Sequence, residues 1–221
     1  MNKAQTFEFF RRLAEDNPDP LTELEFANTY QLLVAVVLSA QATDVGVNKA
    51  TLALFREVTG PEQMVALGEA ALKAHIKTIG LFNTKAKNVI ALSEKLVAEH
   101  GGEVPRDRDA LTALPGVGRK TANVVLNCAW GEETFAVDTH VFRVGNRTRL
   151  AKGKTPEAVE ALLEMRVPAP FRQGAHHWLI LHGRYTCKAR APECWRCVVA
   201  DVCAFKPKTL PPPPQSRRSA G

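Results

Sequence analysis

Hydrophobic residues recur along most of the chain at intervals of three and four, which is the spacing of helices that bury one face. The first clear stripe consists of Leu32, Leu33, Val36, Val37 and Ala40. A second stripe consists of Val89, Ile90, Leu92, Leu96 and Val97. It lies within residues 85–100, and Gly101-Gly102 ends it. Both stripes predict amphipathic helices.

Capping residues and further stripes predict more helices. Asp107 is a suitable N-cap for a short helix, and residues 119–130 read as another helix. Thr155-Pro156 supplies a cap followed by proline at the first helical position, and residues 171–184 form a last amphipathic segment. Strand-like alternation is scarce, with only residues 134–137 ambiguous, so we predict an all-α fold.

The amino-acid composition indicates how many domains the chain can form and which kind of partner it can bind. The 221 residues, 45% of them hydrophobic, suffice for one large domain or two small ones that share a cleft. The formal net charge of +6 and the pI near 9.2 suit a polyanionic partner. A cationic surface that only keeps the protein in solution explains the charge equally well.

The compartment follows from what the chain lacks. Residues 1–15 are mixed and charged, and the longest apolar run, residues 32–38, is far shorter than the roughly 20 residues that span a bilayer. We therefore expect a cytoplasmic protein, associated with the nucleoid if it is prokaryotic, whose thiols stay reduced.

Four of the five cysteines lie close together. Cys187, Cys194, Cys197 and Cys203 follow the spacing C-x6-C-x2-C-x5-C, which indicates a metal centre. Four thiolates can bind a tetrahedral zinc ion or a four-iron cluster, and structural zinc is the commoner use of such a set. Cys128 stands apart on an apolar helical face and is expected in the core.

Two groups of cations suggest contacts with phosphate. Lys188 and Arg190 lie between the first two cysteines, in a loop that a metal centre would fix, although an ordinary solvated loop is equally compatible. Residues 139–156 contain five cations and no acid, which is unusual for a solvated surface and favours a backbone-binding face. The five are Arg143, Arg147, Arg149, Lys152 and Lys154.

A glycine-rich hairpin, residues 114–118, joins two predicted helices. Gly116 and Gly118 permit a tight turn. The backbone N–H groups of this turn, including those of Val117 and Arg119, are expected to face an anion at the start of the next helix. Simple packing remains the alternative. Lys120 follows on the first turn, where the helix dipole disfavours an ammonium group and so favours a nucleophilic amine. A lysine that only contacts phosphate fits the same position.

Asp138 follows the apolar run of residues 135–137 and opens a polar segment. The commoner use of an aspartate at such a place is as a helix N-cap. If the carboxylate lies near Lys120, it can instead stabilise a sugar cation or transfer protons.

Taken together, these motifs resemble the helix-hairpin-helix DNA glycosylase family, and within it the endonuclease III branch. The resemblance runs from Met1 to about Cys203 and is carried by residues 38–44, 79–81, 114–125, 137–143, 176–185 and the cysteine spacing. The hairpin alone is moderately specific. Its combination with Lys120, Asp138 and the four cysteines is highly specific.

The resemblance implies two helical subdomains with a DNA-binding cleft between them. One is a six-helix bundle over residues 22–132, and the other combines residues 1–21 and 133–205 around a [4Fe-4S] cluster, which reverses the preference for zinc. Residues 206–221 are expected to form a disordered, proline-rich basic tail, with Arg217 and Arg218 near its end.

The resemblance also implies roles for residues. Lys120 matches the family's nucleophile and Asp138 its catalytic carboxylate, while Gln41 and Leu81 match positions that enter the base stack when a nucleotide is extruded. Without the resemblance, packing is the simpler role for Gln41 and Leu81. Further candidates for contact with DNA are Arg119, Thr121, His140 and Arg143.

The expected activity is removal of an oxidised pyrimidine such as thymine glycol from duplex DNA, followed by strand cleavage at the abasic site. The expected enzyme is a monomer with no membrane partner. One alternative is an adenine-specific mismatch glycosylase of the same superfamily, which lacks a lysine at the position of Lys120 and usually has an extra C-terminal domain. The other alternative is a non-enzymatic DNA-binding module with structural zinc.

Overall fold

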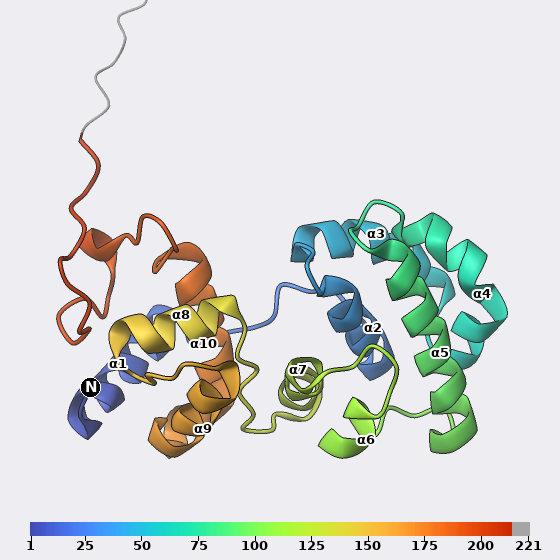
Figure 1. The fold of residues 1–221 in the computed structure, drawn as a ribbon, viewed down its shortest axis with the longest axis horizontal. Helices are drawn as coiled ribbons and strands as arrows, with labels where there is room; N and C mark the ends of the chain where they lie inside the picture. The colour runs from blue at the N-terminus through green and yellow to red at the C-terminus, as the bar shows by residue number, and fades with distance from the viewer. Residues whose placement is uncertain (214–221) are drawn as a thin grey trace, which may run out of the picture. The chain divides into compact units, whose positions relative to one another are not determined.

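The computed structural model describes residues 1–213 and divides the chain into two compact units, both helical (Figure 1). Unit 2 is the continuous segment Leu21–Ala136, whereas unit 1 combines Met1–Pro20 with the chain from Val137 onward. Residues 1–213 contain no β-strand, which confirms the all-α fold. Within the same range, no helix has the length and apolar character needed to cross a bilayer.

Unit 2 is a bundle around one buried helix. Its helices are α2 (Thr29–Ser39), α3 (Asp44–Glu57), α4 (Pro61–Ile76), α5 (Phe82–His100), α6 (Arg108–Thr112) and α7 (Arg119–Trp130). Every residue of α2 from Tyr30 to Leu38 is buried, so this helix is covered on all sides and not on one face only. It packs against α3, α5 and α7, and thereby fixes the helix that carries Lys120.

The end of unit 2 is held by side-chain hydrogen bonds to its last helix. Asn123 Nδ2 donates to the Phe135 carbonyl oxygen at 3.1 Å, and Thr134 Oγ1 donates to the Asn123 carbonyl oxygen at 2.6 Å. These contacts hold residues 134–136 against α7 outside any helix or strand.

Unit 1 joins the two ends of the chain. Its helices are α1 (Lys3–Asp16), α8 (Thr139–Thr148), α9 (Pro156–Arg166), η1 (Ala169–Phe171), α10 (Arg172–Tyr185) and η2 (Cys194–Arg196). Aromatic rings fill its core: Phe10 stacks on Phe171 at 6.1 Å between centroids, and Phe171 meets Trp178 edge to face at 6.2 Å. Trp178 Nε1 donates to the Asn17 carbonyl oxygen at 2.7 Å, which satisfies the one polar group of that ring.

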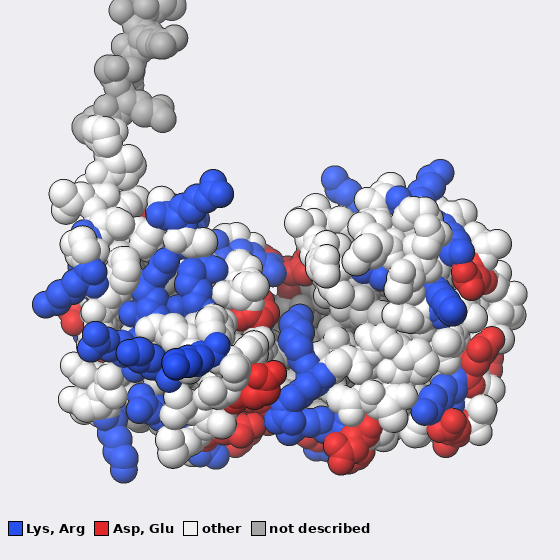
Figure 2. Space-filling view, in the orientation of Figure 1, with Lys and Arg blue, Asp and Glu red and all other residues white. Residues whose placement is uncertain are grey.

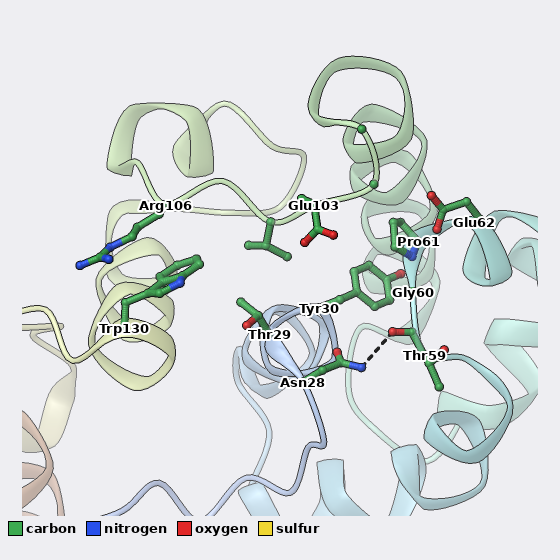
Figure 3. A pocket seen from close by; sticks show the side chains of 13 residues that line it. Asn28, Thr29, Tyr30, Thr59, Gly60, Pro61, Glu62, Glu103, Arg106 and Trp130 are labelled. Atoms are coloured by element: carbon green, nitrogen blue, oxygen red, sulfur yellow. Dashed lines mark hydrogen bonds between the residues drawn. The ribbon is translucent and has the colours of Figure 1, made fainter.

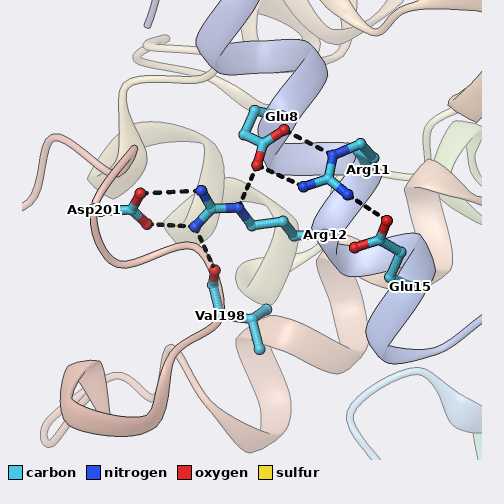
Figure 4. Close-up of polar contacts among 6 residues, drawn as sticks. All are labelled: Glu8, Arg11, Arg12, Glu15, Val198 and Asp201. Atoms are coloured by element: carbon cyan, nitrogen blue, oxygen red, sulfur yellow. Dashed lines mark hydrogen bonds and ion pairs between the residues drawn. The ribbon is translucent and has the colours of Figure 1, made fainter.

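An ionic network fastens α1 to the cysteine segment (Figure 4). Arg12 donates to both carboxylate oxygens of Asp201, at 2.6 and 3.1 Å, and also to the Val198 carbonyl oxygen. Hydrogen bonds from Arg11 and Arg12 lower the pKa of Glu8 to about 2, so this carboxylate stays ionised beside them. The planar two-pronged contact of Arg12 fixes the geometry better than a single point contact.

Part of the expected tail belongs to the folded unit. Lys208 Nζ donates to the Cys203 carbonyl oxygen at 2.8 Å, and Thr209 Oγ1 accepts from the Cys194 N–H at 3.0 Å. The sequence assigned Lys208 and Thr209 to the tail because proline-rich composition says nothing of such specific contacts. Residues 214–221, with Arg217 and Arg218, lie outside the described residues.

Candidate functional site

The hairpin between α6 and α7 uses its two glycines differently. Gly116 has a φ of +77°, and a Cβ atom there would lie 2.8 Å from Asn88 Cβ, so only glycine fits without a shift. Gly118 has ordinary extended backbone, with φ −91° and ψ 174°, and a Cβ atom there would meet nothing within 4 Å. Gly116 therefore shapes the turn, while Gly118 leaves the start of α7 open.

Val117, a predicted contact with DNA, packs its side chain into the core of unit 2. Its side chain is 6% exposed and belongs to the core of unit 2. Its backbone N–H donates to the Leu114 carbonyl oxygen at 3.1 Å. Both groups have partners within the protein, and the contact of Val117 with DNA stays a prediction.

Lys120 is exposed on the first turn of α7. This helix start has no side-chain cap, and its first turn contains no acidic residue. The backbone N–H groups of an uncapped first turn and the helix dipole attract an anion. The amine of Lys120 is therefore presented beside a site suited to phosphate, with Arg119 exposed and Thr121 half-buried next to it.

Asp138 forms the N-cap of α8, and this fixes its carboxylate. Oδ1 accepts hydrogen bonds from the His140 and Val141 N–H groups, both at 2.8 Å. Oδ2 accepts none from the described residues, and the side chain is only half-buried. Asp138 therefore has the capping role that the sequence also allowed, and its second oxygen, Oδ2, remains available for chemistry.

Gln41 and Leu81 stand on two neighbouring loops of unit 2. Both have left-handed backbone, with φ of 55° and 59°, which ordinary side chains rarely adopt. Leu81 is 59% exposed, and a Cβ atom on the adjacent Gly80 would lie 3.9 Å from the Gln41 carbonyl oxygen. An exposed leucine on strained backbone is a candidate for a functional contact, since such strain costs about 1–3 kcal/mol.

Arg143, a candidate for contact with DNA, is used inside unit 1. Its Nε donates to the Cys187 carbonyl oxygen at 3.0 Å, and its Nη2 donates to the Gly183 carbonyl oxygen at 2.7 Å. Nη2 also lies 3.2 Å from His140 Nδ1, and Nη1 reaches the Thr139 carbonyl oxygen. Each of its three nitrogens thus has a partner within unit 1, and contact of Arg143 with phosphate stays a prediction.

Arg147 has a role that sequence reasoning did not identify. One helical turn beyond Arg143, it donates to the carbonyl oxygens of Lys188, at 2.6 Å, and Ala189, at 2.9 Å. Its Nη1 also lies 3.5 Å from Cys187 Sγ. The sequence placed Arg147 in a basic stretch, but it could not predict hydrogen-bond acceptors about forty residues further along the chain.

The four predicted cysteine ligands line one cavity of unit 1. Among the described residues, no three His, Cys, Asp or Glu side chains are placed to hold a single metal ion. A four-iron cluster takes one thiolate per iron, so sulfurs that surround a cavity fit it. Burial raises the pKa of the Cys197 thiol to about 11, so its thiolate needs the positive charge that iron supplies.

The loop between the first two cysteines presents one uncompensated cation. Lys188 Nζ pairs with Glu193 Oε1 at 2.6 Å, whereas Arg190 is exposed and forms no ion pair among the described residues. Figure 2 shows Lys and Arg side chains gathered over α8 in unit 1. Since Arg143 and Arg147 there bind carbonyl oxygens, the patch is partly structural.

Unit 2 also contains a hollow of about 590 Å³, and none of the candidate site residues lines it (Figure 3). The starts of α2 and α4, the segment Gly101–Arg106 and Trp130 line it. Tyr30 forms part of the wall of this hollow, and the Tyr30 hydroxyl lies 2.6 Å from Ser93 Oγ in the core. Burial raises the pKa of Tyr30, so the hydroxyl stays protonated.

Family models match both parts of the chain. Residues 34–169 match the HhH-GPD superfamily of base excision DNA repair proteins, and residues 187–203 match the iron-sulfur binding domain of endonuclease III. The second match spans the four cysteines. It confirms the iron-sulfur cofactor, a [4Fe-4S] cluster, and overturns the preference for zinc that the spacing alone gave.

Known proteins resemble the chain over almost its whole length. Endonuclease III of Escherichia coli K12 is 58% identical over 94% of this chain and 99% of that protein. Endonuclease III of Haemophilus influenzae is 56% identical over the same shares. A solved structure of a trapped covalent intermediate of endonuclease III with DNA has a TM-score of 0.86 and 42% identity, and the match covers 92% of this chain and 96% of that one.

Proposed function

This chain belongs to the HhH-GPD superfamily of base excision DNA repair proteins, in its endonuclease III branch, and from this premise we propose which chemistry its residues perform. It is a DNA glycosylase enzyme of base excision repair. Its substrate is duplex DNA that contains an oxidised pyrimidine or an abasic site. It acts as a monomer, in the cytoplasm with the chromosome.

The first step is extrusion of the damaged nucleotide. The open start of α7 binds a backbone phosphate through N–H groups, and Arg190 adds a cation. Leu81, exposed on its strained loop, enters the base stack, and the amide of Gln41 on the adjacent loop pairs with the orphaned base. Filling the gap offsets the few kcal/mol that base flipping costs.

Lys120 is the nucleophile. Its free amine forms a bond to C1′ of the sugar while the C1′–N bond breaks, and the base leaves with the bonding electron pair and takes up a proton. Loss of the amine proton and ring opening give a Schiff base between Lys120 and the sugar. Removal of a C2′ proton then breaks the C3′–O bond by β-elimination, which cleaves the strand, and water releases the sugar from Lys120.

Asp138 stabilises the charge that develops on the sugar. Its Oδ1 is tied to two backbone N–H groups, so Oδ2 keeps one orientation toward solvent or substrate. Oδ2 faces the positive charge on the sugar ring and then accepts and returns protons in the Schiff base steps. Cys187, Cys194, Cys197 and Cys203 would hold the cluster, which would fix the segment that carries Arg190.

The observation that carries this proposal is the exposed Lys120 on the uncapped, acid-free first turn of α7. Borohydride reduces a Schiff base to a stable amine, so it should trap a covalent complex between the enzyme and an oligonucleotide that contains an abasic site. Lys120→Ala should abolish trapping. Lys87→Ala, a control on an exposed lysine of α5, should trap as the wild type does.

The lesion preference is tested by incision of a panel of duplexes, each with a single lesion. Thymine glycol and related oxidised pyrimidines should be cleaved faster than oxidised purines or mismatched adenine. Faster cleavage of mismatched adenine would assign the chain to the other glycosylase activity considered above. Trapping that persists unchanged in Lys120→Ala would remove Lys120 from the mechanism.

A further inference from the structure

A groove of about 610 Å³ opens on unit 1, where the start of α1 meets the end of α9 and η1. Phe7, Met165 and Val167 supply apolar side chains, and Lys3 and Arg166 supply cations. The volume lies within the range of about 300–1,000 Å³ that is typical of ligand sites. No residue assigned above to catalysis, DNA or the cluster lines it.

The apolar part of the groove is preformed. Phe7 is 46% exposed, yet its ring is held edge to face against Phe171 at 5.2 Å between centroids. Met165 is 69% exposed, and Val167 at 1% forms the floor. Two exposed apolar side chains from separate helices thus converge, and methionine adapts its shape to different partners.

The charge of the groove has one sign. Neither Lys3 nor Arg166 forms an ion pair among the described residues, and no Asp or Glu lines the groove. Arg166 Nη1 donates to the Leu150 carbonyl oxygen at 2.9 Å, which holds this cation at the rim. The groove also includes the first turn of α1, a helix of 14 residues without an acid in that turn, so the dipole adds positive potential.

We propose that this groove docks an acidic peptide segment of another protein, with one or two apolar side chains inserted between Phe7 and Met165. The carboxylates would lie against Lys3 and Arg166, while the apolar side chains cover Val167. The end of this chain is a poor occupant because Arg217 and Arg218 make it basic. A nucleic-acid backbone matches the charge but offers no aliphatic side chain for the floor. The proposal does not depend on the mechanism of Lys120.

Fluorescence anisotropy with a labelled peptide of glutamates around one leucine and one phenylalanine tests the proposal on the full chain with its cluster. We expect saturable binding that salt weakens. Binding should weaken at least about tenfold when glutamine replaces the glutamates, and likewise when alanine replaces the apolar pair. Damaged duplex DNA should still be incised while the peptide is bound.

Two variants locate the site. Met165→Glu should weaken peptide binding at least about tenfold, because it places a repelling charge at the apolar contact. Leu52→Glu, a matched change at a leucine of unit 2 that is 55% exposed, should leave peptide binding as in the wild type. Both variants should retain the cluster absorbance and the incision rate, which separates loss of the groove from misfolding.

Three results would overturn the proposal. The first is absence of saturable binding, and the second is equal affinity of Met165→Glu and the wild type for the peptide. The third is dimerisation in sedimentation that Met165→Glu abolishes, which would make the groove an interface between copies of this chain. Incision by the wild type in the same samples shows that none of these results reflects failure of the proposed enzyme activity.

Discussion

The helices α7 and α8 begin in opposite ways. At α7, Gly118 leaves the first turn without a side-chain cap, whereas at α8 the carboxylate of Asp138 takes up two N–H groups. An uncapped start keeps its N–H groups for an external anion, and a capped start uses them to orient its own acid. The first-turn donors of a helix can thus be left for an external anion or used to orient an acid of the protein itself, and the residue at the N-cap decides which.

The largest effect is expected from Asp138→Asn. Asparagine caps helices as well as aspartate, so the free energy of unfolding should change by less than about 0.5 kcal/mol. Turnover should fall roughly a thousandfold, because the neutral amide cannot balance a sugar cation or accept a proton. Single-turnover incision and urea titration measure the two effects. Asp138→Ala, which also loses the cap, should cost a further ~1 kcal/mol of stability. Full activity of Asp138→Asn would leave Asp138 with the cap alone.

The second effect comes from closing the open start with Gly118→Asp. The backbone of Gly118 already has the extended conformation of an N-cap, and a Cβ atom added there meets no atom within 4 Å. We expect the unfolding midpoint to rise, since a cap contributes about 1 kcal/mol. Affinity for any duplex should fall about a hundredfold, because a fixed carboxylate now occupies the phosphate site and repels phosphate. Gly118→Ser supplies a cap without charge and should lose less affinity. Unchanged affinity of Gly118→Asp in a gel-shift titration would place the DNA elsewhere.

A third, smaller effect separates the two hairpin glycines. Gly116→Ala should destabilise unit 2 by about 1–3 kcal/mol, because alanine is strained at a φ of +77° and its Cβ would press on Asn88. Gly118→Ala should leave the unfolding midpoint within about 0.5 kcal/mol of the wild type. Thermal and urea unfolding of both variants check this difference, and equal losses of stability would contradict it.

The smallest effect concerns α5, whose start also has no side-chain cap. Lys85 lies on its first turn with 5% exposure, and its Nζ has no hydrogen-bond partner. Burial lowers the pKa of Lys85, so the unfolded chain binds more protons than the folded one between that lowered pKa and 10.5. Stability should therefore rise with pH across this window. Lys85→Met should be more stable than the wild type near neutral pH, and the difference should shrink toward pH 10.5. A difference that stays constant with pH would show that the pKa of Lys85 is the same in the folded and the unfolded chain.

Much of the fold follows from sequence patterns, and the exceptions have physical causes. The stripes of α2 and α5 predicted both helices, whereas the patterns of α3 and α4 did not stand out. In α3 the buried face includes the polar Thr51, and in α4 the left-handed Gly68 interrupts the helix and resets its phase. A periodic pattern is readable only where one face stays apolar and the helix remains continuous.

Some features of the candidate site could also be predicted from the sequence, and others could not. The helix-start positions of Lys120 and Asp138 were predicted because each position is a local property of the chain. The partners of Arg143, the carbonyl oxygens of Cys187 and Gly183, lie about forty residues away and could not be predicted from the local sequence. The inward packing of the Val117 side chain could not be predicted either, because a hairpin motif does not tell which of its residues packs inward.

The tie between Arg12 and Asp201 also constrains how the molecule is made. Unit 2 is one continuous stretch of chain, so a ribosome releases all of it before unit 1 is complete. Helix α1 is synthesised first but finds Asp201 and Val198 only after the cysteine segment has emerged. Unit 2 can therefore fold during synthesis, whereas α1 completes its contacts only after the cysteine segment has emerged. Assembly of the cluster and docking of the first helix are thus expected to be late, coupled events.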